Sequence, residues 1–280
     1  MTEPEITSAR SPRVTEVRQL HDRRHRVRRG AFVVEGPQAL ECAIDDGRAA
    51  GAGQPGVHVF ADPEALGRHR ALVARARRSG ATVTVVAPEV LRAMAETRQP
   101  QGLVAVCPLV TVDTATALAA ADGLAVILAG VADPGNAGTI IRTADALGAG
   151  AVVLTEGSVD PHNGKCVRST AGSLFHVAVA SDAPVREALA EARSCGLEIV
   201  AADGRADVEL GSEEAERILR GPVAWVFGSE AHGILPVVRA EVAHAIAVPM
   251  AGRAESLTLA AAAAICLYAT VSAQRRRAQA

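Results

Sequence analysis

With 280 residues and 49% hydrophobic side chains, the chain is long enough for two domains of ordinary size and can bury a core in each. Its five cysteines are scattered without a CxxC pair, which argues against disulfides and zinc and favours free thiols in a reducing compartment. The formal net charge is only −2, so a uniformly basic protein is excluded, although one basic run lies near the N-terminus.

The first 107 residues predict one α/β unit. A polar arm and a basic helix occupy residues 1–30. Short apolar runs bounded by turn residues then predict strands, and the segments between them predict helices. The strands are expected at 31–36, 57–60, 81–86 and 103–107, and the helices at 37–45, 63–78 and 88–96.

Residues 108–122 predict a linker with a short helix, and residues 123–280 predict a second α/β unit. Its strands are almost wholly apolar, which is typical of a parallel sheet covered on both faces. They are expected at 124–129, 151–154, 176–179, 198–201, 223–227 and 245–248, with helices at 136–148, 164–173, 184–194 and 256–273. The apolar run 257–273 is too short and too polar for a membrane span and predicts a buried terminal helix.

The basic run is Arg23-Arg24-His25-Arg26-Val27-Arg28-Arg29. A local basic patch on a nearly neutral protein favours a polyanionic partner such as RNA. A solvated helix face or a frayed terminus is the alternative interpretation. The N-terminus carries Glu3 and Glu5 and has no apolar segment of a secretory signal, so we expect a cytoplasmic protein.

Three segments in the second unit combine a strand end, glycines and polar residues, an arrangement that α/β folds use for ligands. The first runs from Leu128 through Asn136 to Arg142 and Gly148, the second from Trp225 through Glu230 to Gly233, and the third from Val248 through Ser256 to Leu257. Taken singly, each has a plain structural interpretation: Asn136 and Ser256 as helix caps, and the second segment as a strand–turn–helix connection.

Taken together and in order, the three segments read "Asn-x-Gly-x-Ile-x-Arg-Thr-Ala", "Gly-x-Glu-x-x-Gly" and "Pro-Met-x-Gly-x-x-x-Ser-Leu". This pattern closely resembles the SpoU family of the SPOUT methyltransferases, over about residues 124–273. Residues Arg23–Arg29 with the following Phe32-Val33-Val34-Glu35-Gly36 resemble, less specifically, the RNA substrate-binding domain common in that family.

The resemblance implies a C-terminal knotted methyltransferase domain with a parallel sheet at 123–280 and a smaller N-terminal α/β RNA substrate-binding domain at 1–107. It implies S-adenosylmethionine as cofactor, a homodimer and no metal. The implied catalytic residues are Asn136, Arg142, Glu230 and Ser256. The implied cofactor-binding residues are Phe227, Gly228, Gly233, Val248, Met250 and Leu257, and the RNA-binding residues are Arg23, Arg24, Arg26, Arg28 and Arg29.

The predicted activity is methyl transfer to a ribose 2′-hydroxyl, with ribosomal RNA as first choice and transfer RNA as an alternative. Because a guanidinium is a poor proton acceptor and a good phosphate ligand, Arg142 is expected chiefly to clamp a phosphate and orient the hydroxyl. One departure matters: Thr258 stands where the family usually has Asn. It leaves open a catalytically silent RNA-binding protein on the same fold.

Overall fold

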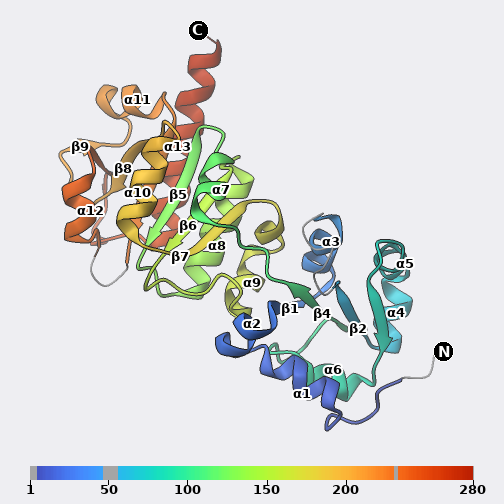
Figure 1. Cartoon of the computed structure of the whole chain (residues 1–280). Helices are drawn as coiled ribbons and strands as arrows, with labels where there is room; N and C mark the ends of the chain where they lie inside the picture. The colour runs from blue at the N-terminus through green and yellow to red at the C-terminus, as the bar shows by residue number, and fades with distance from the viewer. Residues whose placement is uncertain (1–4, 47–55, 230–232, 280) are drawn as a thin grey trace. The chain divides into compact units, whose positions relative to one another are not determined.

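The computed structural model describes residues 5–46, 56–229 and 233–279, and the chain forms two compact units (Figure 1). Unit 1 comprises Met1–Val110 and His162–His176, and unit 2 comprises Thr111–Pro161 and Val177–Ala280. The segment His162–His176, which the sequence-based division places in the second domain, is therefore packed in unit 1.

Unit 1 is built on a four-stranded sheet in the order β1-β4-β2-β3. The strands are β1 (Ala31–Glu35), β2 (His58–Ala61), β3 (Thr82–Val85) and β4 (Leu103–Pro108). The helices are α1 (Pro12–Gln19), α2 (Arg23–Arg29), α3 (Pro37–Asp45), α4 (Pro63–Arg68), α5 (Arg70–Arg78), α6 (Pro88–Met94), α9 (Gly164–Thr170) and the 3-10 helix η2 (Ser173–Phe175). β4 pairs antiparallel with β1 and β2, whereas β2 and β3 are parallel.

The predicted single helix at 63–78 is wrong, because the chain forms two helices that meet at His69. His69 has φ −109° and ψ 32°, outside the helical region, and Gly67 just before it is a weak helix former. The predicted helix at 164–173 is also too long. Ala171 and Gly172 both have positive φ, which ends α9 and leaves η2 as a separate turn.

The segment 162–176 is held in unit 1 by its aromatic and charged side chains. Phe32 of β1 is fully buried, and its ring lies 4.6 Å from His162 and 6.0 Å from Phe175 between centroids. The nearly buried Glu35 carboxylate accepts a hydrogen bond from Arg168 at 3.1 Å and two from Thr97. A buried carboxylate is costly without partners, so these contacts stabilise the packing of α9 against β1.

Unit 2 is built on a seven-stranded sheet in the order β7-β6-β5-β10-β8-β11-β9. The strands are β5 (Leu124–Ala129), β6 (Ala151–Thr155), β7 (Ala178–Ala183), β8 (Glu198–Ala202), β9 (Val208–Glu209), β10 (Val223–Gly228) and β11 (His244–Ala247). The helices are α7 (Thr114–Ala119), α8 (Pro134–Ala146), α10 (Val185–Ser194), α11 (Glu213–Leu219), α12 (Pro236–Glu241) and α13 (Leu259–Gln279). All recorded pairs are parallel, which confirms the predicted fold class.

Helices cover both faces of this sheet, as its apolar strands predict (Figure 1). On one face α7, α10 and α12 pack on alternate residues of β5, β8 and β10, such as Ile127 and Val226. On the other face α13 packs on β10, whose Trp225 and Phe227 rings stack with centroids 5.9 Å apart, and α8 packs on α13 and β5. The buried indole of Trp225 donates a hydrogen bond of 2.8 Å to the Thr270 hydroxyl, so this polar group is satisfied inside the core.

Several boundaries in unit 2 differ from the predictions. α8 begins at Pro134 rather than at 136, because Pro is favoured in a first turn and Asp133 caps it. α13 begins at Leu259 rather than at 256 and continues to 279. α11, α12 and the two-residue β9 were not predicted, although Ser212 before three glutamates is a helix-start signal. Among the described residues, no helix is long and apolar enough to cross a membrane.

Candidate active site

The parallel sheet of unit 2 brings the three motif segments to one edge. Strands β5, β10, β8 and β11 are neighbours in that order and run in the same direction. Their carboxyl ends are Ala129, Gly228, Ala202 and Ala247, and the first, second and third motifs follow β5, β10 and β11. Open α/β sheets bind ligands at this edge, so the topology places the motifs where the sequence interpretation needs them.

A cavity of about 190 Å³ opens at this edge. Its lining includes the third motif, with Val248, Met250, Ser256 and Leu257, and the end of β8. Met250 and Leu257 are exposed at 41% and 36%, so both side chains are accessible at the cavity. The cavity therefore brings together three of the predicted cofactor-binding residues and one predicted catalytic residue.

The described residues on either side of the second motif's undescribed segment 230–232 lie side by side after β10. Ser229 and Gly233 form an isolated bridge, in which the Gly233 amide donates to the Ser229 carbonyl at 2.8 Å. A Cβ atom on Gly228 would lie 2.0 Å from the Gly233 carbonyl oxygen, so no side chain fits there. Phe227 is buried in the core beneath this turn. The predicted catalytic residue Glu230 lies outside the described residues.

Asn136 and Arg142 both lie on α8, after the first motif. Asp133 caps this helix by accepting a hydrogen bond from the Asn136 amide at 2.8 Å, so the interpretation of Asn136 as the cap is wrong. Asn136 is half-buried in the first turn, whereas Arg142 is exposed and makes no hydrogen bond or ion pair with a described residue. Neither lines the cavity of the third motif.

The cap of α13 is Thr258 and not Ser256. Ser256 is exposed and lines the cavity, so it is not the cap of α13. Thr258 is the cap instead: its hydroxyl accepts from the Ala261 amide at 3.3 Å, and its carbonyl accepts from the Ala262 amide at 3.0 Å. Thr and Asn both serve as helix caps, so the departure from the family pattern keeps this local function.

Sequence reasoning missed Asp203, the first residue after β8. Its side chain is 7% exposed, forms an ion pair with Arg239 of α12, and accepts the Arg205 amide at 3.0 Å. Asp203 also lines the cavity, together with Glu255. The signal was available, because an acid directly after an apolar parallel strand lies at the ligand-binding edge. The Asp203 charge is compensated by Arg239, which leaves Glu255 as the carboxylate of the lining without a paired cation among the described residues. One such carboxylate beside the apolar side chains of Val248, Met250 and Leu257 is compatible with S-adenosylmethionine, which carries both apolar surface and a positive charge.

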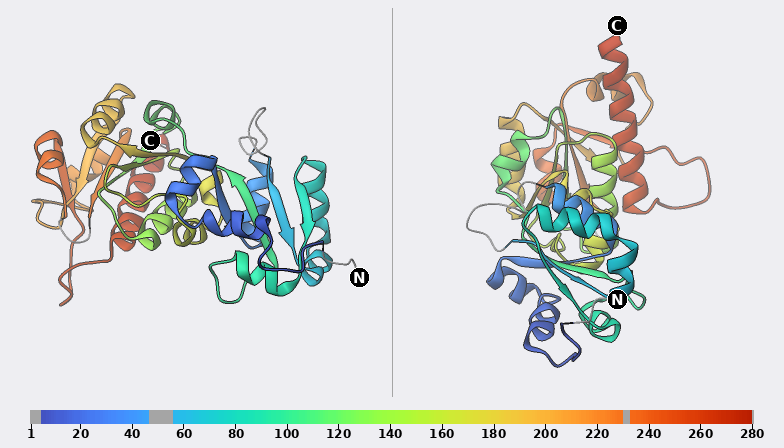
Figure 2. Two further views of the ribbon diagram at one scale, coloured as in Figure 1. Left: turned by 60° about the horizontal axis from the view of Figure 1, so that its bottom comes forward. Right: turned by 90° about the vertical axis from the view of Figure 1, so that its right-hand side faces the viewer.

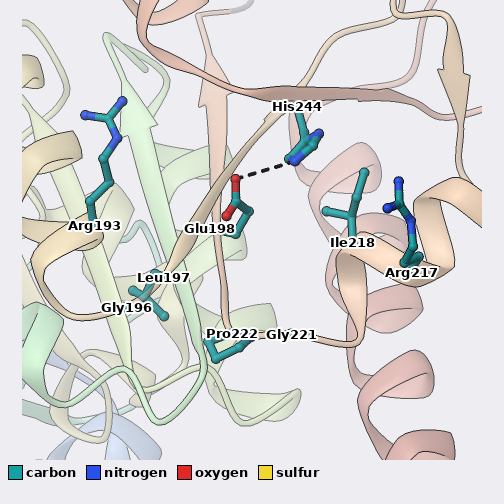
Figure 3. A pocket seen from close by; sticks show the side chains of 9 residues that line it. All are labelled: Arg193, Gly196, Leu197, Glu198, Arg217, Ile218, Gly221, Pro222 and His244. Atoms are coloured by element: carbon teal, nitrogen blue, oxygen red, sulfur yellow. Dashed lines mark ion pairs between the residues drawn. The ribbon is translucent and has the colours of Figure 1, made fainter.

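A further cavity of about 520 Å³ lies where strands β8, β10 and β11 begin, at the opposite edge of the sheet (Figure 3). His244 Nε2 lies 3.5 Å from Glu198 Oε1 within it, and Arg217 approaches from α11. None of the predicted site residues lines this cavity.

The basic segment of unit 1 forms α2, and its arginines are not equivalent. Arg23, Arg24, Arg28 and Arg29 are exposed. Arg26 is 3% exposed, and its Nη1 donates to the carbonyls of residues 20 and 21 at 2.9 and 2.8 Å. Its guanidinium therefore stabilises the turn before α2 and is not presented to a ligand.

No group of metal-ligating side chains occurs among the described residues. The structure pairs none of the five cysteines in a disulfide; Cys107, Cys166 and Cys266 are buried, whereas Cys195 is exposed.

These features define an α/β protein with a candidate ligand site at the carboxyl edge of a parallel sheet and a separate α/β unit that carries a basic helix. Residues 123–268 match the SpoU rRNA Methylase family, and residues 11–105 match the MRM3-like substrate binding domain. The chain belongs to the SpoU rRNA methylase family.

Relatives resemble the chain over nearly its whole length. It is 30% identical to the 23S rRNA (guanosine(2553)-2′-O)-methyltransferase RlmP of Bacillus subtilis, over 94% of this chain and 98% of that protein. The AdoMet-bound rRNA methyltransferase from Sinorhizobium meliloti superposes with a TM-score of 0.81 at 28% identity, covering 97% of both chains. The SpoU methyltransferase AviRb from Streptomyces viridochromogenes with the cofactor AdoMet also gives 0.81 at 28% identity, over 96% and 100% of the chains. The predicted family, its methyltransferase class and S-adenosylmethionine as cofactor are confirmed.

Proposed function

We propose that this chain transfers a methyl group from S-adenosylmethionine to a ribose 2′-hydroxyl of ribosomal RNA. The observation that carries the proposal is the cavity at the carboxyl edge of the unit 2 sheet, lined by Val248, Met250, Ser256 and Leu257 of the third motif. The names of relatives such as RlmP, which include 23S rRNA and 2′-O-methyl transfer, support the substrate.

The cofactor supplies an electrophilic methyl group, so the chain must orient the acceptor hydroxyl and assist loss of its proton. In our proposal the exposed Arg142 guanidinium binds the phosphate next to the target ribose and orients its hydroxyl. Asn136, on the first turn of the same helix, positions the ribose. Ser256, Glu230, Gly228 and Gly233 complete the proposed catalytic and cofactor-binding set, together with Phe227, whose ring is buried and which can contribute only its backbone.

We further propose that α2 contacts the RNA backbone through Arg23, Arg24, Arg28 and Arg29. Two observations support this role: the four side chains are exposed, and residues 11–105 match the MRM3-like substrate binding domain. Arg26 is left out because its guanidinium is bound to backbone carbonyls. The domain division at 1–107, 108–122 and 123–280 stays a proposal, supported by the limits of the two family matches.

A homodimer, a trefoil knot in the C-terminal domain and a cytoplasmic location are part of the same proposal. Support for a dimer comes from apolar surface on unit 2: Ile265 and Tyr268 of α13 are exposed at 39% and 66%, besides Met250 and Leu257. The segment between β11 and α13, which carries Met250 and Leu257, projects from the rest of unit 2 (Figure 2). A second copy covering this surface would remove it from water.

The second candidate is a catalytically silent RNA-binding protein, favoured by Thr258. Its hydroxyl is engaged in capping α13, and a Thr side chain lacks the amide donors of Asn. If Thr258 weakens the reacting centre, Thr258→Asn should raise the single-turnover rate without changing RNA affinity, because Asn preserves the cap.

The test is mass-spectrometric mapping of 2′-O-methylated nucleotides in total RNA from cells with and without the protein. A site lost with the gene and restored by the parent chain, but not by Arg142→Ala, supports the proposal. An unchanged methylation map, with retained RNA binding by the purified protein, favours the silent binder. A mapped site in transfer RNA alone would replace ribosomal RNA as the substrate.

A further inference from the structure

A second concave surface lies in unit 1, on the face of its four-stranded sheet beside α1. This cavity, of about 500 Å³, is named here the sheet-face pocket. All four strands contribute to its floor through Ala31, His58, Phe60, Thr82 and Val106. His58 pairs in register with both Thr82 and Val106, which places these side chains side by side on one face.

The floor of the sheet-face pocket contains a fixed aromatic pair. The rings of His58 and Phe60 stack with centroids 4.2 Å apart at an interplanar angle of 20°. His58 Nε2 also hydrogen-bonds to the Thr84 hydroxyl at 2.9 Å, which holds the imidazole in place. Partial burial, and after it the Arg13 guanidinium, lower the pKa of His58, so a neutral ring is presented at pH 7.

The rim of the pocket is basic. Arg13 of α1 is exposed and makes no hydrogen bond or ion pair with any residue that the structure describes. Arg29, the last residue of α2, lies 3.5 Å from Glu16, a pair with 35% and 55% side-chain exposure. Such an exposed pair is weak and leaves Arg29 available to a stronger anion. The rim is therefore continuous with the exposed arginines of α2.

We infer that the sheet-face pocket binds one unpaired nucleotide of the RNA substrate, with its base against His58 and its phosphates at Arg13 and Arg29. The inference rests on the proposed function, and it adds a site that reads single-stranded RNA away from the reacting centre. Sequence-specific RNA recognition uses unpaired bases stacked on aromatic rings of a sheet face, with arginines on the backbone. The aromatic and apolar floor suits the base of a nucleotide, and the basic rim suits its phosphate.

Other occupants fit less well. Extended peptides usually add to the edge of a sheet through its backbone, whereas this pocket lies on the face and is lined by side chains from all four strands. An RNA duplex keeps its bases stacked inside, so it cannot place one against His58. Single-stranded RNA should therefore bind in preference to a duplex of the same length.

The test compares full-length variants in binding a fluorescein-labelled single-stranded RNA of mixed sequence and about ten nucleotides, and its duplex. His58→Ala removes the stacking ring, and Thr82→Trp fills the pocket from an exposed strand position that tolerates aromatic residues. Each should weaken single-strand binding roughly 5- to 100-fold, the cost of one lost stacked base. Arg13→Ala should reduce the salt slope by about 0.7.

Arg92→Ala is the matched control, because Arg92 is an exposed arginine of unit 1 on α6 and does not line the pocket. It should bind the single strand as the parent chain does. Thermal melting and S-adenosylmethionine affinity are measured for every variant. Because Thr82 is exposed, Thr82→Trp leaves the buried core of unit 1 unchanged. It therefore keeps the test decisive if His58→Ala unfolds the domain.

Photocrosslinking with 4-thiouridine in the same single strand locates the base. Crosslinks in 58–61 or 82–85, together with the affinity losses, support the inference. Parent-like affinity in both His58→Ala and Thr82→Trp, with crosslinks elsewhere, overturns it while methylation by the parent chain upholds the proposed function. A parent chain that neither binds nor methylates RNA overturns both. A change in oligomeric mass of Thr82→Trp with unchanged RNA affinity would assign the pocket to a protein contact instead.

Discussion

Replacing Gly228 by Ala tests the turn that closes the second motif. The new Cβ would lie 2.0 Å from the Gly233 carbonyl oxygen and 2.7 Å from the Ile234 amide nitrogen. Ordinary contact begins at 3.4 Å, so the returning backbone must move by about 3.4 − 2.0 = 1.4 Å. A valine would collide in the same way, so the effect of either substitution is to displace the turn and not to fill an open cofactor pocket.

A displacement of this size at a reaction site costs on the order of 100-fold in rate, because the reacting groups lose alignment. We expect Gly228→Ala to lower kcat/KM for methyl transfer by about that factor and to weaken S-adenosylmethionine binding. Crowding in packed structure also costs roughly 1–3 kcal/mol of folding free energy. Calorimetry with the cofactor, single-turnover transfer to the mapped RNA and thermal melting measure the three effects.

Gly221→Ala is the matched control, since Gly221 precedes the same strand and its Cβ would meet only the Ile218 carbonyl at 3.6 Å. It should behave as the parent protein in all three assays. If Gly228→Ala were indistinguishable from Gly221→Ala in cofactor affinity and rate, the turn would be either freely adjustable or remote from the chemistry, and the reasoning would fail.

Three other predictions concern single side chains. Arg142→Ala should lower single-turnover methyl transfer by at least about 100-fold with cofactor affinity retained, and Arg142→Lys should restore little, because an ammonium lacks the planar two-pronged geometry; parent-like transfer in Arg142→Ala would remove it from the site. Thr270→Val should destabilise unit 2 by about 1–3 kcal/mol in denaturant unfolding, because the buried Trp225 indole loses its acceptor, and an unchanged midpoint would contradict this. At pH 8 a maleimide should label the exposed Cys195 first, whereas burial raises the pKa of the Cys107 thiol to about 12 and keeps it protonated; equal labelling rates in peptide mapping would refute the predicted order.

Sequence periodicity located the sheet of unit 2 well because its strands are buried on both faces and therefore almost wholly apolar. β5 occupies the predicted residues 124–129, and β10 exceeds its predicted range by one residue. Elements without a continuous apolar run were missed. β9 is two residues long, and α12 is a six-residue helix with one buried side chain, Val238. Short elements of this kind are stabilised by tertiary contacts that local pattern does not record.

The candidate site was predictable in its location but less so in its individual roles. Motif order at successive strand ends predicted the ligand-binding edge. The assignment of caps failed because Asp133 and Thr258, three and two residues from the expected positions, offer equally good side-chain acceptors. Arg26 could not be distinguished from its neighbours in the basic run, since its burial depends on the turn at residues 20 and 21.

The path of the chain through His162–His176 bears on how the protein can be divided. The polypeptide leaves unit 2 after Pro161, packs in unit 1, and returns at Val177, so three peptide connections join the units. A methyltransferase domain cut out at residue 123 would contain Phe175 but not Phe32, on which Phe175 packs. The remaining N-terminal fragment would in turn expose the ring of Phe32 to water. The two units therefore cannot be exchanged as separate domains, and a protease cut near residue 110 alone would leave His162–His176 of the C-terminal fragment packed on the N-terminal fragment.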